Sequence, residues 1–204
     1  MSKYQLNESS IYIKGTDVPK NKLNIIDSNI IHEIENNLLK QAYNKFSNEL
    51  KNNTKFNEKY FIDLHKKTFE SLYNFAGIYR TANMTKKDSL FCLADNLANQ
   101  SKRIFDELSK DNYLQQCKCK KEFAKKLAYF QGELIALHPF YELNGRILRL
   151  FCDMLCLING YKAINYSNSI SNEEYIKASI ECVQYANIDR LENIIFNGLD
   201  ELEI

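Results

Sequence analysis

Residues 121–158 read KEFAKKLAYFQGELIALHPFYELNGRILRLFCDMLCLI, two apolar stretches joined by a polar loop. In the first stretch, from Phe123 to Leu137, apolar residues recur at steps of three and four, the spacing of one buried helix face. The second stretch, from Ile147 to Ile158, is apolar nearly all round, which predicts a helix at the centre of the core. This segment therefore predicts an all-α bundle.

Helical spacing continues on both sides of this segment. We expect further helices over residues 28–52, 57–75, 94–109, 172–186 and 188–199. Residues 79–93 have β-branched and aromatic ends around a polar middle, which predicts a short β-hairpin, while residues 1–27 form a polar, irregular N-terminal arm. With two prolines, six glycines and no linker in 204 residues, we expect one domain over residues 1–204.

The composition narrows the classes of function. The 27 Lys and Arg residues against 26 Asp and Glu give a net charge of +1, which argues against a generic nucleic-acid binder. The sequence has no secretion signal and no run of eighteen apolar residues, so we expect no membrane partner and a cytoplasmic location. Six scattered cysteines lack the paired spacing of a zinc site, and reduced thiols are favoured over a metal held by Cys117, Cys119, Cys152 and Cys156.

The loop between the two central helices, residues 138–149, has a predictable backbone. A proline follows His138 and disfavours helical dihedral angles before it, so the upstream helix should end before His138 and His138 should be extended. The next helix should begin at Asn144 and Gly145, where free N–H groups and the positive end of the helix dipole suit an anion.

The side chains around this helix start favour phosphate chemistry. Arg146 and Arg149 are two of only five arginines in the chain, and their spacing lets both hold one anion, most simply a phosphate chain. Glu142 offers a hard oxygen ligand for Mg²⁺, and His138 can accept a proton at neutral pH. Together they predict transfer of a phosphorus-containing group from a nucleotide to a hydroxyl, with His138 as the base.

The stretch His138–Arg146 resembles the Fic-domain signature H-P-F-x-[DE]-G-N-[GK]-R at eight of nine positions, counting the variable one, and Arg149 matches a second arginine usual one turn later. The resemblance extends to three more segments: Gly15–Leu23, Arg80–Lys86 and Asn172–Tyr175. It implies a Fic-type helical bundle in which the hairpin 79–93 is a flap beside the active site.

By this resemblance the chain is a protein adenylyltransferase that moves AMP from ATP to a Tyr, Ser or Thr hydroxyl of a protein, including itself. His138 would be the general base and Glu142 the Mg²⁺ ligand. The flap would dock the protein target as an added strand. The resemblance implies these ATP-binding residues: Glu142, Leu143, Asn144, Gly145, Arg146, Arg149, Thr85, Lys86 and Lys87.

Two departures from the family pattern bear on activity. Leu143 stands where the signature has Gly, and a positive φ there would cost about 1 kcal/mol or more. Glu35 and Asn36, on the helix expected over 28–52, resemble the end of an inhibitory motif, [ST]-x-x-x-E-[GN], whose Glu meets the second arginine, here Arg149. Ile31 replaces the hydroxyl residue of that motif, so we expect partial inhibition.

Simpler interpretations stay open for some residues and for the activity. Glu35 could be a solvated side chain, the flap residues 85–87 a solvated turn, and His32 and His65 structural. A Doc-like protein kinase is an alternative, although Gly145 stands where that kinase has a basic residue. A nucleotide-binding interaction module with little catalysis is another, and a homo-oligomer is left open.

Overall fold

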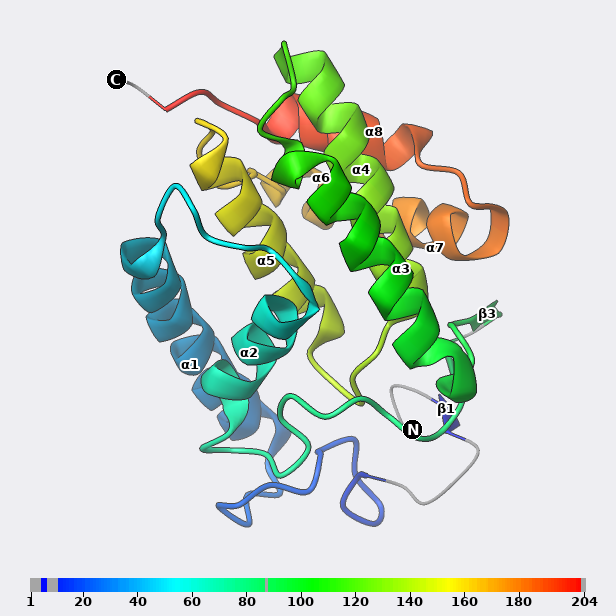
Figure 1. The fold of residues 1–204 in the computed structure, drawn as a ribbon. Helices are drawn as coiled ribbons and strands as arrows, with labels where there is room; N and C mark the ends of the chain where they lie inside the picture. Colours follow the sequence, from blue (N-terminus) through cyan, green and yellow to red (C-terminus); the bar gives the residue numbers. More distant parts are fainter. Residues whose placement is uncertain (1–4, 7–10, 87, 203–204) are drawn as a thin grey trace.

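The computed structural model describes residues 5–6, 11–86 and 88–202 and has a helical architecture (Figure 1). The helices are α1 (Ser28–Glu49), α2 (Glu58–Phe69), α3 (Leu97–Lys110), α4 (Lys120–Leu137), α5 (Asn144–Ile158), α6 (Ser167–Ser171), α7 (Glu174–Tyr185) and α8 (Asp189–Gly198), with 3-10 turns η1 (Ala94–Asn96) and η2 (Asn112–Leu114). The strands are β1 (Gln5–Leu6), β2 (Met84–Lys86) and β3 (Ser89–Leu90). The predicted fold class, an all-α bundle with a hairpin, is confirmed.

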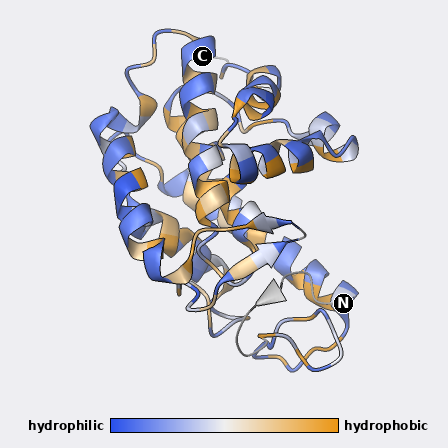
Figure 2. Cartoon of the chain, turned by 90° about the vertical axis from the view of Figure 1, so that its right-hand side faces the viewer, coloured by the Kyte–Doolittle hydropathy of each residue, from blue (hydrophilic) through white to orange (hydrophobic). Residues whose placement is uncertain are grey.

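Helix α5 is the centre of the bundle. It packs against α1, α2 and α4, and Figure 1 shows it between the α1–α2 pair and the α3–α4 pair. Leu150, Phe151 and Leu155 on this helix are fully buried, as the apolar run predicted. Hydrophilic residues line the outward faces of the helices (Figure 2). No helix in the described ranges is long and apolar enough to cross a bilayer.

Helix α2 is shorter than expected, because it ends at Phe69 and not near residue 75. The following turn is held by its own contacts: the Tyr73 N–H donates to the Phe69 carbonyl, and the N–H of Gly77, at φ 75°, donates to Nδ1 of His65. A left-handed glycine and an imidazole acceptor thus reverse the chain where apolar spacing alone predicted more helix. The five-residue helix α6 was also not predicted.

The flap is a small antiparallel sheet in the order β1-β2-β3. Thr85 of β2 pairs with Leu90 of β3 on one side and with Gln5 of β1 on the other. The predicted hairpin is therefore present as β2 and β3. The sequence did not predict β1, which belongs to the N-terminal arm and makes β2 the middle strand of a three-stranded sheet.

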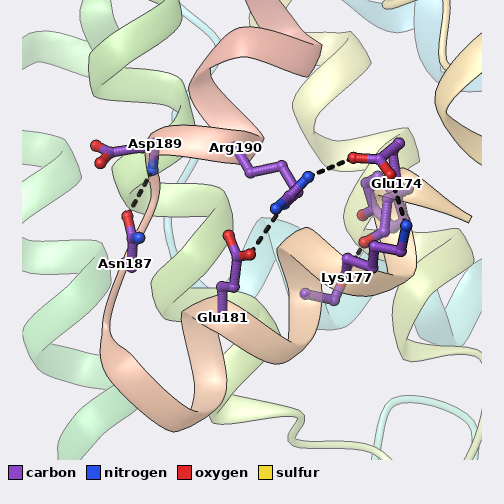
Figure 3. Close-up of polar contacts among 8 residues, drawn as sticks. Glu174, Lys177, Glu181, Asn187, Asp189 and Arg190 are labelled. Carbon is purple, nitrogen blue, oxygen red and sulfur yellow. Dashed lines mark hydrogen bonds and ion pairs between the residues drawn. The ribbon is translucent and has the colours of Figure 1, made fainter.

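An ion-pair network joins α7 to the start of α8 (Figure 3). Arg190 bridges Glu174 and Glu181, and Lys177 pairs with Glu174 at 2.8 Å. These side chains are largely open to solvent, which screens their charges, so the pairs add little to stability. The network links α7, which forms one wall of the candidate active site, to the start of α8.

Candidate active site

The loop between α4 and α5 begins with a backbone conformation that corrects a prediction. Helix α4 ends at Leu137 as expected, but His138 is left-handed, with φ 44° and ψ 58°, and not extended. Its N–H still donates to the Leu134 carbonyl, so His138 caps the helix. The proline rule is overridden by bonds from elsewhere in the chain, since Arg80 donates to the His138 carbonyl at 2.9 Å.

The loop ends with a second left-handed residue. Leu143, at φ 68°, is the residue before α5, so the position that carries Gly in the signature does require a positive φ here. The Asn144 side chain closes the loop through two bonds with Phe140: its Oδ1 accepts from the Phe140 N–H and its Nδ2 donates to the Phe140 carbonyl. Asn144 therefore offers its main-chain N–H to a ligand, while its side chain holds the loop.

A cavity of about 380 Å³ opens at the start of α5. Its lining includes most of the residues that the sequence predicted to act in catalysis or to bind ATP: His138, Glu142, Leu143, Asn144, Gly145, Arg146, Arg149 and Lys86. Thr85 does not line it, Lys87 lies outside the described residues, and Asn36 on α1 is exposed and apart from it. The N–H groups at the start of α5 have no acceptor within the helix, so the cavity floor is suited to phosphate.

Sequence reasoning missed the wall opposite the loop. Ile176, Ser179, Ile180 and Val183 form one stripe of α7 along the cavity, and Ser89 and Phe91 of the flap region complete it. The spacing of Ile176, Ile180 and Val183 is visible in the sequence, but the helix expected over residues 172–186 was not given a part in the site on that ground. A flat apolar ring beside a phosphate chain would fit such a wall.

His138 is 8% exposed, and its ring is held from the flap side. The Phe91 ring stacks on it with centroids 3.8 Å apart and planes at 13°. This contact fixes the plane of the imidazole, so the ring faces the cavity in a limited range of orientations.

Glu142 is 4% exposed and is oriented by neighbours from two distant segments. Tyr12 of the N-terminal arm donates to its Oε1 at 2.6 Å, and the Leu143 N–H donates to its Oε2 at 3.3 Å. The main-chain carbonyl of Glu142 contacts Nε2 of His65 at 3.1 Å. Because His65 Nδ1 accepts a bond from a main-chain N–H, the proton lies on Nε2, and burial lowers the His65 pKa to about 4. His65 is thus a structural, neutral residue.

Glu35 is buried at 3% exposure and is not a solvated side chain. Its Oε2 pairs with Nη1 of Arg146 at 2.8 Å, and its Oε1 accepts from the Tyr73 hydroxyl. Arg149, the partner expected from the motif, lies 5.6 Å over the ring of Tyr175 on α7. The expected pairing is therefore wrong in its partner, because α7 provides an aromatic face that draws Arg149 away from α1.

The thiols are free cysteines: Cys152 and Cys156 are buried, and burial holds the pKa of each well above its usual range. Among the described residues, no three His, Cys, Asp or Glu side chains converge as a metal cluster would require. Glu142 is the only carboxylate lining the cavity in the described part of the chain. A single carboxylate beside a phosphate cradle fits Mg²⁺, which takes one or two carboxylates and fills its other positions with phosphate oxygens and water.

Known proteins match this chain over much of its length. The Fic/DOC family model matches residues 55–156. A Sinorhizobium fredii protein named "Probable protein adenylyltransferase y4lH" is 30% identical over 162 residues, which are 79% of this chain and 82% of that protein. "Protein adenylyltransferase VbhT" of Bartonella schoenbuchensis is 33% identical over 150 residues, 74% of this chain and 30% of that protein.

A solved structure supports the fold. The BepC protein of Bartonella tribocorum, crystallised with bound AMPPNP, aligns with a TM-score of 0.79 and 23% identity, over 95% of this chain and 97% of that chain. The family model covers half of the sequence, and the rhizobial relative is matched over most of its length. The chain belongs to the Fic/DOC family.

Proposed function

We propose that this chain is a protein adenylyltransferase, which transfers AMP from ATP to a hydroxyl of a protein. The observation that carries the proposal is a single cavity that brings His138, Glu142, Arg146 and Arg149 to the first turns of α5. The names of the similar proteins of Sinorhizobium fredii and Bartonella schoenbuchensis support the same reaction class.

The reaction follows from the roles that these side chains can fill. The target hydroxyl oxygen attacks the α-phosphorus of ATP, the bond from that phosphorus to the oxygen bridging to the β-phosphorus breaks, and pyrophosphate leaves. The hydroxyl proton moves to His138. The N–H groups at the start of α5 and the Arg146 guanidinium hold the α- and β-phosphates, and Arg149 reaches the γ-phosphate.

Glu142 would hold Mg²⁺ at the edge of the phosphate chain. Bound there, the ion would neutralise charge on the phosphate oxygens. The bond from Tyr12 orients the carboxylate toward this task. Chelation by EDTA should abolish label transfer, and added Mg²⁺ should restore it.

Labelled nucleotides separate this function from its alternatives. Incubation with α-labelled ATP should place the label on protein, and γ-labelled ATP should not. The reverse pattern would indicate a protein kinase, and no label in either case would indicate a nucleotide-binding module. His138→Ala should abolish α-label transfer while ADP still binds, because His138 is not part of the phosphate cradle; unchanged transfer would refute the mechanism.

We assign a regulatory role to the contact between α1 and the phosphate cradle. Glu35 occupies the Arg146 guanidinium that a phosphate needs, so Glu35 and ATP compete for it. Ile31, where the motif has a hydroxyl, is a core residue at 1% exposure, so Glu35 is held by the Tyr73 hydroxyl but receives no hydrogen bond from position 31. Glu35→Gly should therefore raise the initial rate of α-label transfer only modestly, and a rise of several orders of magnitude would contradict partial inhibition.

Target docking on the flap must take account of the N-terminal arm. Because β1 and β3 are the two edge strands of the sheet, a target segment that adds to it would pair with β1, pair with β3 or displace β1. A double substitution, Gln5→Pro with Leu6→Pro, removes the β1 donors. It should raise target labelling if the target displaces β1, lower it if the target pairs with β1, and leave it unchanged if the target pairs with β3. The cytoplasmic location, the single domain and a homo-oligomer remain predictions.

A further inference from the structure

Arg80 is a fully buried arginine, at 2% exposure, between the flap and the catalytic loop. Its guanidinium makes four hydrogen bonds, and all four end on main-chain carbonyl oxygens. Nε donates to His138 at 2.9 Å, Nη1 to Ala82 at 2.8 Å, and Nη2 to both Leu137 and Cys92. The catalytic roles assigned above do not use this residue.

Two of these carbonyls belong to the last turn of α4 and the residue that follows it. Leu137 and His138 lie at the negative end of the helix dipole, where carbonyls lack intrahelical donors and a cation is favourable. The Arg80 main-chain N–H adds a bond to the carbonyl of Pro139 at 2.8 Å. Arg80 therefore binds three consecutive carbonyls around a left-handed histidine that the following proline would otherwise push toward an extended conformation.

The other two carbonyls lie at the two ends of the flap. Ala82 precedes β2 and Cys92 follows β3. One guanidinium therefore binds both ends of the hairpin and, at the same time, the end of α4. Phe91, the residue before Cys92, stacks on the His138 ring at 3.8 Å. The His138 main chain and the ring that covers its imidazole thus depend on one guanidinium.

We infer that Arg80 is a positioning residue that couples the flap to the general base, because it holds the His138 main chain and the end of the flap so that the Phe91 ring stacks on the His138 imidazole. The inference rests on the proposed role of His138 and adds a residue outside the cavity lining. Burial lowers the Arg80 pKa to about 10, which leaves the group cationic at neutral pH. A lysine in its place could bind some of these carbonyls but lacks the planar fork that reaches all four.

The test compares Arg80→Lys with Arg103→Lys, a matched change at a partly exposed arginine on α3 that pairs with Glu107 and Glu133. In Arg80→Lys we expect kcat for α-label transfer to fall about 100-fold, the effect of a misplaced catalytic group. The KM for ATP and the Kd for ADP should change less than about threefold, because the phosphate cradle lies on α5 and is untouched. Arg103→Lys should leave all three constants unchanged. A KM increase with unchanged kcat would overturn the inference.

A second measurement does not depend on transfer activity and therefore separates this inference from the proposed function. In the full chain, NMR of the His138 imidazole should show altered ring shifts in Arg80→Lys, because the Phe91 ring no longer stacks at the same distance. Phe91→Leu should alter the same resonances, and the double variant should lower kcat by less than the product of the two single effects. Unaltered His138 resonances in Arg80→Lys, or fully multiplicative losses, would show that Arg80 does not act through this contact.

Discussion

Leu143 allows a quantitative test of the loop geometry, because two effects of known size oppose each other at one residue. The side chain is 6% exposed and packs in the core, so truncation to Ala should cost about 2–5 kcal/mol of unfolding free energy. The main chain is left-handed at φ 68°, a conformation that costs a residue with a Cβ about 1–2 kcal/mol. Burial is the larger effect, so both Leu143→Ala and Leu143→Gly should be less stable than the natural chain.

The comparison between these two variants isolates the backbone. Relative to Leu143→Ala, Leu143→Gly removes the left-handed penalty of about 1–2 kcal/mol from the folded state. It also lowers the unfolding free energy by about 0.4–1 kcal/mol, because glycine increases the entropy of the unfolded chain. Leu143→Gly should therefore be more stable than Leu143→Ala by about 0.5–1 kcal/mol, or 1–4 °C in Tm for a chain of this size.

Leu150 supplies the matched control, because it is fully buried within α5 and has a helical backbone. There the order should reverse, with Leu150→Ala more stable than Leu150→Gly by about 1 kcal/mol. Urea unfolding followed by circular dichroism measures all four variants. If glycine is the worse residue at both positions, the left-handed conformation of Leu143 is refuted; if Leu143→Gly exceeds the natural chain in stability, the side chain does not contribute to the core.

Two further predictions concern groups that hold the loop from outside. Because burial sets the folded pKa of His65 at about 4, below the ordinary 6.5, the stabilisation from its neutral ring is complete above pH 6.5 and is lost as the pH falls toward 4, by up to about 3 kcal/mol. Urea unfolding at several pH values between 7 and 4 gives the unfolding free energy as a function of pH. This free energy should fall less steeply with decreasing pH in His65→Gln than in the natural chain. In His32→Gln, an exposed control, it should fall as steeply as in the natural chain. Tyr12→Phe removes a buried bond to a carboxylate and should cost about 1.5–3 kcal/mol in thermal unfolding, whereas Tyr185→Phe, at 73% exposure, should cost nothing measurable; equal losses would show that the bond to the carboxylate adds no stability.

The sequence predicted well those features that depend on periodicity or on local chemistry. The helices around α4 and α5 follow from apolar residues at steps of three and four, and the cavity collects the residues whose types suggested phosphate and a base. The glycine of the family signature raised a positive φ at residue 143 as a condition that would strain a leucine, and Leu143 does have φ 68°.

The failures have a common physical cause, which is that distant side chains decide the local backbone or the partner. The proline rule predicted an extended His138, but a guanidinium 58 residues away binds its carbonyl. Helical spacing predicted α2 to residue 75, but Gly77 turns back to His65. Motif logic paired Glu35 with Arg149, yet Tyr175 of α7 covers that arginine. None of these contacts has a signal in the local sequence.

The catalytic loop shows why a leucine can stand at a position that favours glycine. Its two ends, His138 and Leu143, are both left-handed, and its carbonyls are bound by side chains from outside α4 and α5, Arg80 and His65. A bond from a neutral donor such as His65 is worth about 0.5–1.5 kcal/mol and one from a charged donor such as Arg80 about 1.5–3 kcal/mol, so together they can offset the left-handed penalty of about 1–2 kcal/mol at Leu143. The loop conformation is therefore imposed by its surroundings, and the residue at 143 can serve the core while its N–H still faces Glu142.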